Sequence, residues 1–299
     1  MKYLLVLVYL FSLQASAKYL FTEKTFSPYG KWYVASEDEV EQIKHLLRKL
    51  IKSKTGKRLL GLANDKANEM NLSLYDVLKA GNGSLTDTTL IRKFSAHDPT
   101  HITYHSESKV FINKNLTQLD ALLDLAHELT HFVHRRNFNP YEKNFSLSEF
   151  IVNTIEGEGG EAQAFVTECN VLYELFPTLK DQRYNCHEIH DGQHLSFKKA
   201  VNKFYQIGTY FENFETVLEK HGIRSEFPKI SSEKASFVSS AYGIPYPVAA
   251  FEEYLTVINK VCENDKKRLA YLKQDKGREP ASISNLETNY KTRCETVFN

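Results

Sequence analysis

Apolar residues recur at intervals of three and four along most of the chain, which predicts a protein built mainly from helices. The clearest such segment starts with a capping sequence at Thr117 and continues to Arg135. Its apolar positions are Leu119, Leu122, Leu123, Ala126, Leu129 and Val133. Comparable spacing predicts helices over residues 36–51, 57–70, 147–155, 160–175, 196–207, 210–221 and 248–267.

Two short segments alternate instead, so we expect strands over residues 101–105 and 109–113, joined at 106–108. Glycine and asparagine predict a loop at 80–84. The fold class that follows is α+β and helix-rich, with a small edge sheet beside the 117–135 helix. An edge strand at this position can pair with an extended peptide.

The amino terminus has the features of a secretory signal peptide. Lys2 precedes an apolar run that ends near Leu13, and Ala15-Ser16-Ala17 fits a cleavage site. We therefore expect residues 1–17 to be removed and residues 18–299 to form one exported domain, secreted or periplasmic. An amino lobe over about 18–136 and a helical carboxyl lobe over about 137–299 are the expected parts.

The balance of basic and acidic residues limits the classes of partner that the protein is expected to bind. Without Lys2 the chain carries 37 basic and 37 acidic residues, which argues against a nucleic-acid binder or a polybasic membrane-binding protein. No second long apolar run follows the signal segment. The expected partner is a peptide or protein substrate, with no membrane association after processing; the oligomeric state stays open.

Four cysteines remain in the expected mature chain, and in an exported protein an even number favours disulfides. Sequence alone allows three pairings. Closing the shortest loops gives Cys169 with Cys186 and Cys262 with Cys294. The spacing lacks the CxxC pairs of a cysteine-rich zinc site.

The candidate chemistry lies within the 117–135 helix. His127 and His131 are four residues apart, so both imidazoles leave one helix face and can share a metal ion, with Glu128 beside them. A catalytic zinc needs three protein ligands and an open position. The HExxHxxGxxH pattern is excluded, because His134 and Asn137 occupy its glycine and third-histidine positions.

Acids of the glycine-rich turn 25–30 residues beyond His131 are the main candidates for the third ligand. Glu161 opens Glu-Ala-Gln-Ala, and over roughly residues 100–175 the chain resembles the gluzincin metallopeptidases. That resemblance implies a zincin-like two-lobed fold and one zinc ion bound by His127, His131 and Glu161. Alternative ligands are Glu158, Glu156, Glu252 and Glu253.

The resemblance also implies roles for further residues. Glu128 becomes the general base. Phe165 stands where some gluzincins carry an acid that orients a ligand histidine, so this chain departs from the family there, and Asp124 and Glu168 are the candidate substitutes. The segment Ser240-Ala241-Tyr242-Gly243 resembles one in lethal-factor-like zinc peptidases, which makes Tyr242 a candidate donor to an oxyanion. His134 is expected to line or support the cleft.

A second histidine cluster, His187, His190 and His194, is interrupted by the turn signal Asp191-Gly192 and is expected to be solvated.

The function predicted is an exported zinc peptidase. A hydrolase of cell-wall peptide cross-links and an inactive zinc-containing binding protein are the alternatives.

Overall fold

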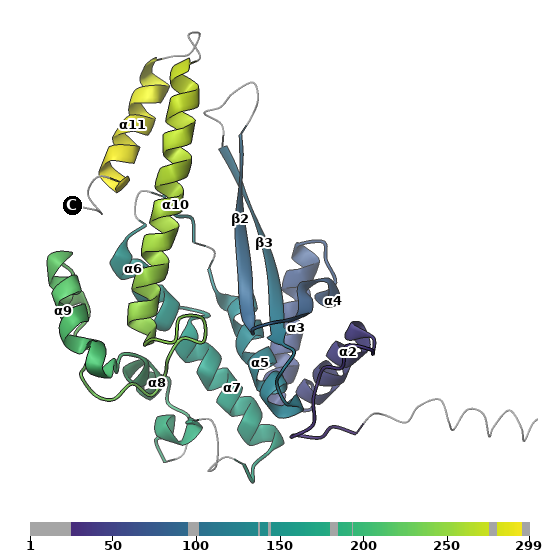
Figure 1. Ribbon diagram of the computed structural model, residues 1–299. Helices are drawn as coiled ribbons and strands as arrows, with labels where there is room; N and C mark the ends of the chain where they lie inside the picture. The colour runs from purple at the N-terminus through teal and green to yellow at the C-terminus, as the bar shows by residue number, and fades with distance from the viewer. Residues whose placement is uncertain are drawn as a thin grey trace, which may run out of the picture.

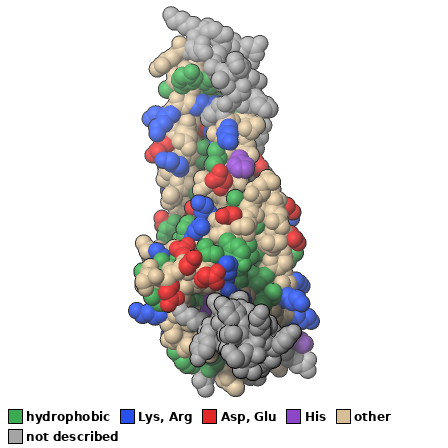
Figure 2. Space-filling view, turned by 90° about the vertical axis from the view of Figure 1, so that its right-hand side faces the viewer, with side chains coloured by type: hydrophobic (Ala, Val, Ile, Leu, Met, Phe, Trp, Pro, Cys, Tyr) green, Lys and Arg blue, Asp and Glu red, His purple; other side chains and the backbone are tan. Residues whose placement is uncertain are grey.

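The structure is a computed structural model that describes residues 25–94, 102–136, 138–142, 145–179, 185–192, 194–274 and 280–294. The expected signal peptide, residues 1–17, lies outside the described residues. The helix-rich α+β class is confirmed, because helices predominate and the described strands form one small sheet. Figure 2 shows an elongated molecule with acidic and basic side chains interspersed over the face in view.

The described α-helices in chain order are α2 (Glu39–Leu50), α3 (Lys54–Glu69), α4 (Leu74–Val77), α5 (Gln118–His134), α6 (Leu147–Ile155), α7 (Glu161–Leu175), α8 (Phe197–Phe204), α9 (Phe211–Lys220), α10 (Tyr246–Gln274) and α11 (Pro280–Cys294). Short 3-10 helices lie between α7 and α10, at Cys186–Ile189, Gly208–Tyr210 and Arg224–Glu226. Helices α5, α6 and α7 lie within one residue of the predicted segments. Helix α10 is longer than predicted, and α11 was not predicted.

The two amino-terminal helices start at polar caps, although not where the sequence analysis placed them. Asp38 caps α2, two residues beyond Ser36. Ser53 caps α3, so Gly56 lies in the first turn of α3 and does not terminate α2. A Cβ on Gly56 would lie 2.3 Å from the Leu50 carbonyl oxygen, which explains the glycine at this tight connection.

The sheet differs from the prediction in strand number and order. Its strands are β1 (Leu78–Gly81), β2 (Leu85–Phe94) and β3 (Ile102–Asn113), arranged β1-β3-β2. The expected break at 106–108 is wrong, because β3 is continuous and pairs with β2 along its length. Central β3 is therefore not the edge strand. The edge strands are β1 and β2, each of which pairs with β3 on one side only within the described chain.

Helix α5 occupies the centre of the molecule (Figure 1). It contacts α3, α7 and the sheet, and most of its side chains are buried. One continuous cluster of buried apolar side chains extends from Trp32 to Ile258 and includes residues of every helix from α2 to α10. This packing holds one face of α5 against α7 and so fixes the relative positions of their polar side chains.

The long β2–β3 hairpin and the α10–α11 pair extend in the same direction away from the core (Figure 1). Asp265 of α10 is 1% exposed and pairs with Arg92 of β2 at 3.0 Å and Arg293 of α11 at 3.2 Å. The two guanidinium groups satisfy a carboxylate that would otherwise be buried alone. This cluster therefore connects the hairpin to the helical pair.

Both predicted disulfides are confirmed. Cys169 of α7 is bonded to Cys186, and Cys262 of α10 is bonded to Cys294 of α11. Each bond closes a short loop and attaches a peripheral segment to a core helix. Among the described residues, no helix combines the length and apolar character that crossing a bilayer requires.

Candidate metal centre

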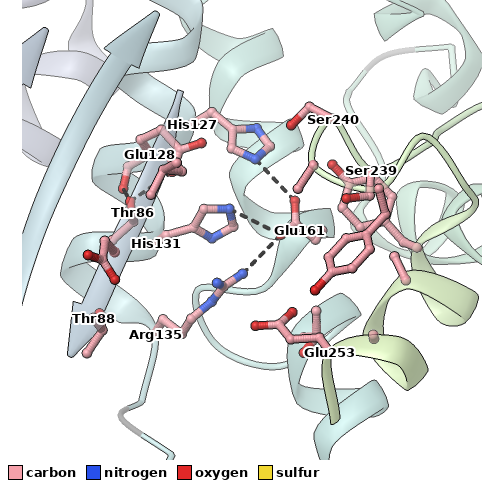
Figure 3. A pocket seen from close by; sticks show the side chains of 18 of the residues that line it. Thr86, Thr88, His127, Glu128, His131, Arg135, Glu161, Ser239, Ser240 and Glu253 are labelled. Carbon is pink, nitrogen blue, oxygen red and sulfur yellow. Dashed lines mark hydrogen bonds and ion pairs between the residues drawn. The ribbon is translucent and has the colours of Figure 1, made fainter. Parts of the chain in front are cut away.

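Helices α5 and α7 bring the three predicted metal ligands together. Thr117 caps α5, as predicted, and the helix places His127 and His131 on one face. Glu161 is the first residue of α7, where Gly160 is the cap. In Figure 3 both imidazoles point toward the Glu161 carboxylate.

The distances from Glu161 to the two histidines are close to those between neighbouring ligands of one metal ion. Oε2 of Glu161 lies 3.2 Å from Nε2 of His127, and Oε1 lies 3.4 Å from Nε2 of His131. In a tetrahedral zinc site with bonds of about 2.0–2.1 Å, neighbouring ligand atoms lie about 3.3–3.4 Å apart. Possible ligand atoms of His127, Glu128 and His131 also lie within 4.8 Å of one another. The described residues therefore include a group that could bind a metal ion.

The second nitrogen of each imidazole has its own partner. Nδ1 of His131 donates to the Gly159 carbonyl oxygen at 2.7 Å. Nδ1 of His127 lies 3.3 Å from Oε2 of Glu168, one of the two acids expected in this supporting role. These contacts at Nδ1 leave Nε2 of both rings facing Glu161. Histidine ligands of metal ions are commonly oriented by such contacts at their second ring nitrogen.

Gly159 is essential to this geometry. It adopts φ +69°, and a Cβ at this position would lie 2.2 Å from the backbone nitrogen of Arg135. Only glycine can enter this turn so close to the end of α5. The glycine-rich segment thus delivers a backbone acceptor to His131 as well as starting α7 at Glu161.

Charges in the site are strongly coupled. Burial alone would raise the pKa of Glu161, but His131 and His127 outweigh it and hold that pKa well below its usual value. Burial opposes the protonation of His127, yet hydrogen bonds to Glu161 and Glu168 raise its pKa well above the usual value. The negative charge of Glu161 and the positive charge that His127 can carry therefore favour each other.

Arg135 is a member of the site that the sequence analysis missed. Its Nη2 donates to Oε1 of Glu161 at 3.0 Å. The residue follows His131 by four positions, so the same helical spacing that identified the histidines could have indicated it. Arg135 adds a second cation beside the ligand carboxylate.

Glu128 faces the sheet side of the centre. It is 8% exposed, and the Thr86 hydroxyl donates to its carboxylate (Figure 3). Thr86 was not predicted as a site residue, because β2 itself was not predicted. Asp124, the other expected supporting acid, is half-buried near Glu128 and Glu168, and desolvation raises its pKa to about 6.

A cavity of about 780 Å³ opens at these residues. One wall includes β2, with Thr86, Thr88 and Leu90 along it. The opposite wall comes from residues 237–257, including Tyr246 and Glu253. The cavity therefore lies between the edge strand and the start of α10, with the candidate ligands at its base.

The alternative ligands lie elsewhere. Glu156 accepts a hydrogen bond from Tyr205 and forms an ion pair with Lys229. The Glu158 side chain is 60% exposed, and its Oε1 lies 3.9 Å from Nδ1 of His134. Glu252 is exposed, and Glu253 lines the cavity close to Arg135. None of these acids makes a recorded contact with His127 or His131 in the described part of the chain.

Two tyrosines approach the cavity from the opposite wall. Tyr242, the predicted oxyanion donor, lines the cavity but is 44% exposed. Tyr246, at the first residue of α10, was missed. Its ring packs against Phe204, with centroids 4.9 Å apart, and burial followed by the charges of Glu161 and Glu128 holds its pKa well above the usual value.

The second histidine cluster is not assembled in the described residues. His190 accepts a hydrogen bond from the Gly192 backbone through Nδ1, and Asp191 caps the His194 backbone. No group of potential metal ligands within 185–192 and 194–274 includes these histidines. No protein-family model matches the chain, and no curated protein or solved structure matches it.

Proposed function

We propose that the protein is an exported zinc-dependent peptidase with the zincin-like, two-lobed arrangement and gluzincin ligand set that its motifs resemble. The observation that carries this proposal is the placement of Glu161 at 3.2 and 3.4 Å from Nε2 of His127 and His131. Two nitrogen donors and one carboxylate at these separations suit a catalytic zinc that keeps an open position.

Zinc would supply a Lewis acid that polarises a carbonyl group and lowers the pKa of a water molecule to about 7. Glu128 would accept the proton of that water and transfer it to the leaving amine. A tyrosine hydroxyl from the opposite wall would donate to the negative charge that develops on the carbonyl oxygen. Tyr242 and Tyr246 are the candidates for this donor.

The outer edge of β2, which pairs with no strand among the described residues, supports a peptide as substrate. A strand that pairs on one side only exposes backbone donors and acceptors that an extended peptide can satisfy. Leu85, Thr86 and Thr88 of β2 line the cavity beside Glu128. The two disulfides are typical of proteins outside the reducing cytosol and support export.

The first experiment measures metal content and casein cleavage by the purified protein, with and without a chelator. We expect stoichiometric zinc and cleavage that stops on chelation and returns on adding zinc. Glu128→Gln should retain zinc and lose about 10²–10⁴-fold in turnover, since general base catalysis contributes this much.

The outcomes separate the alternatives. Zinc-dependent cleavage of cross-linked cell-wall peptides, with none of casein, would favour the cell-wall hydrolase. Bound zinc with no hydrolysis of either substrate would favour the binding protein. Full activity of Glu128→Gln would contradict the proposed mechanism.

A further inference from the structure

Strand β2 contacts the general base of the proposed reaction directly. The Thr86 hydroxyl lies 2.8 Å from Oε2 of Glu128 and 2.8 Å from the main-chain carbonyl oxygen of the same residue. Thr86 and Glu128 are 42 residues apart in sequence, so this contact joins the edge strand to the centre of α5. Figure 3 shows Thr86 immediately beside Glu128.

A threonine hydroxyl has a single proton and therefore donates to one of these two oxygens at a time. An ionised carboxylate is the stronger acceptor, because charge-assisted hydrogen bonds are about twice as strong as neutral ones. The Glu128 carbonyl oxygen lies within a helix, where the backbone already supplies a donor. The hydroxyl is thus directed to the carboxylate.

We infer that Thr86 is a positioning residue for Glu128. By holding Oε2 against the strand, it fixes the side-chain torsions and leaves Oε1 as the oxygen that accepts a proton from water. Thr86 is the only hydrogen-bond partner recorded for this carboxylate within the described ranges. The inference rests on the proposed function, since it assigns a role in the same reaction.

The position of Thr86 in the sheet makes the restraint rigid. Thr86 pairs with Val110 of the central strand, and Val110 is fully buried. The strand backbone therefore cannot shift without disturbing the core. A catalytic group gains from such support because displacements of about 1 Å from the productive geometry can cost about 10²-fold in rate.

Thr88 provides a matched control on the same strand. It is two residues further along, on the same side of β2, and it also lines the cavity. Its hydroxyl lies 3.0 Å from Oγ of Ser108 on the neighbouring strand. Replacing Thr88 thus removes an equivalent hydroxyl from the same strand without removing a contact to Glu128.

The test compares Thr86→Val, Thr86→Ser and Thr88→Val in the full chain, with a peptide that the wild-type protein cleaves. Thr86→Val keeps the shape of the side chain and should lower kcat by about 10–100-fold, the usual cost of losing a group that orients an active-site residue. The KM value and zinc content should stay within about twofold. Thr86→Ser should restore most of kcat, and Thr88→Val, which keeps the strand backbone and every contact to Glu128, should lower kcat far less than Thr86→Val.

A crystal structure of zinc-bound Thr86→Val supplies a readout independent of activity. We expect the Glu128 carboxylate to leave the position beside β2 while the ligand side chains stay in place. Should Thr86→Val not fold, Thr86→Ala and Thr86→Ser serve in its place with the same expected order of kcat.

A Thr86→Val enzyme with wild-type kcat, or an unmoved Glu128, would overturn the inference. Equal losses in Thr86→Val and Thr88→Val would also overturn it, because they would indicate a general effect on the strand. These results leave the proposed function intact as long as Glu128→Gln remains inactive. If Glu128→Gln is fully active, the proposed function itself fails.

Discussion

The base of the cavity and its two sides reach the same centre in different ways. We call the base, formed by α5 and α7, the first wall, and the two sides, β2 and the start of α10, together the second wall. Helices α5 and α7 supply His127, His131 and Glu161 from two neighbouring segments that pack together in the core. The other wall supplies Thr86 from β2 and Tyr246 from α10, residues separated by much of the chain. The first wall is set by helical spacing, and the second by strand pairing and long-range packing.

This difference suggests a division of roles. Ligands on rigid, buried helices are held in place whether or not a substrate is present. The second wall carries the groups that would contact a peptide or the reacting oxygens. Substitutions in the first wall should therefore change metal binding, whereas substitutions in the second should change turnover with metal retained.

The largest effect is expected for Glu161→Ala. Structural zinc sites bind with about 10–16 kcal/mol shared among four ligands, so one ligand corresponds to roughly 2.5–4 kcal/mol, or about 10²–10³-fold in affinity. Competition with a chromophoric chelator measures the zinc dissociation constant. Glu158→Ala, which changes an exposed acid three residues earlier, is the matched control and should leave affinity unchanged.

A loss of zinc in Glu158→Ala, with full retention in Glu161→Ala, would show that the ligand assignment is wrong. It would also contradict the division between the walls, because the ligand would then come from an exposed turn and not from the buried start of α7.

The next effect concerns the two tyrosines. Removing one donor to an oxyanion costs about 10²–10³-fold in kcat, so we expect this loss for Tyr246→Phe. A phenol is protonated and able to donate at neutral pH, and burial raises the pKa of half-buried Tyr246 further. Tyr242 is largely exposed, and Tyr242→Phe should change kcat by less than about threefold. Steady-state kinetics and zinc analysis of both variants provide the measurement.

The reverse ranking, with a large loss in Tyr242→Phe alone, would support the assignment made from sequence. A loss of zinc in Tyr246→Phe would place this residue with the first wall, because its hydroxyl would then be needed to hold Glu161 in position.

The first wall could be predicted from sequence because its information is local. The spacing of His127 and His131 defines one helix face, and Thr117 marks where that helix starts. Glu161 follows a glycine turn that the sequence shows directly. The disulfide pairing was also correct, since both bonds close short loops.

The second wall could not be predicted in this way. Strand β2 is rich in threonine and charge, because one edge and much of one face meet the cavity or solvent, so it lacks the alternation that identifies a half-buried strand. Its pairing with β3 is a tertiary property. Tyr246 was missed because its burial depends on Phe204, more than 40 residues away.

The smallest effect is expected for Asp124→Asn, and it concerns stability of the metal-free protein. Burial raises the pKa of Asp124 from 3.8 to about 6 in the folded state. The folded protein therefore holds a proton that the unfolded chain releases, and stability decreases as the pH rises from about 4 to 6. At 1.36 kcal/mol per pH unit, the cost at pH 7 is on the order of 2–3 kcal/mol.

Asparagine has no charge to bury, so Asp124→Asn should resemble the wild type near pH 4 and become more stable by about 2 kcal/mol at pH 7. Urea unfolding with a chelator present, repeated across this range, measures the difference. Asp87→Asn, an exposed acid lining the same cavity, is the control and should show little change at any pH. If the difference in free energy of unfolding between Asp124→Asn and the wild type does not change with pH, the Asp124 carboxylate is solvated like that of exposed Asp87.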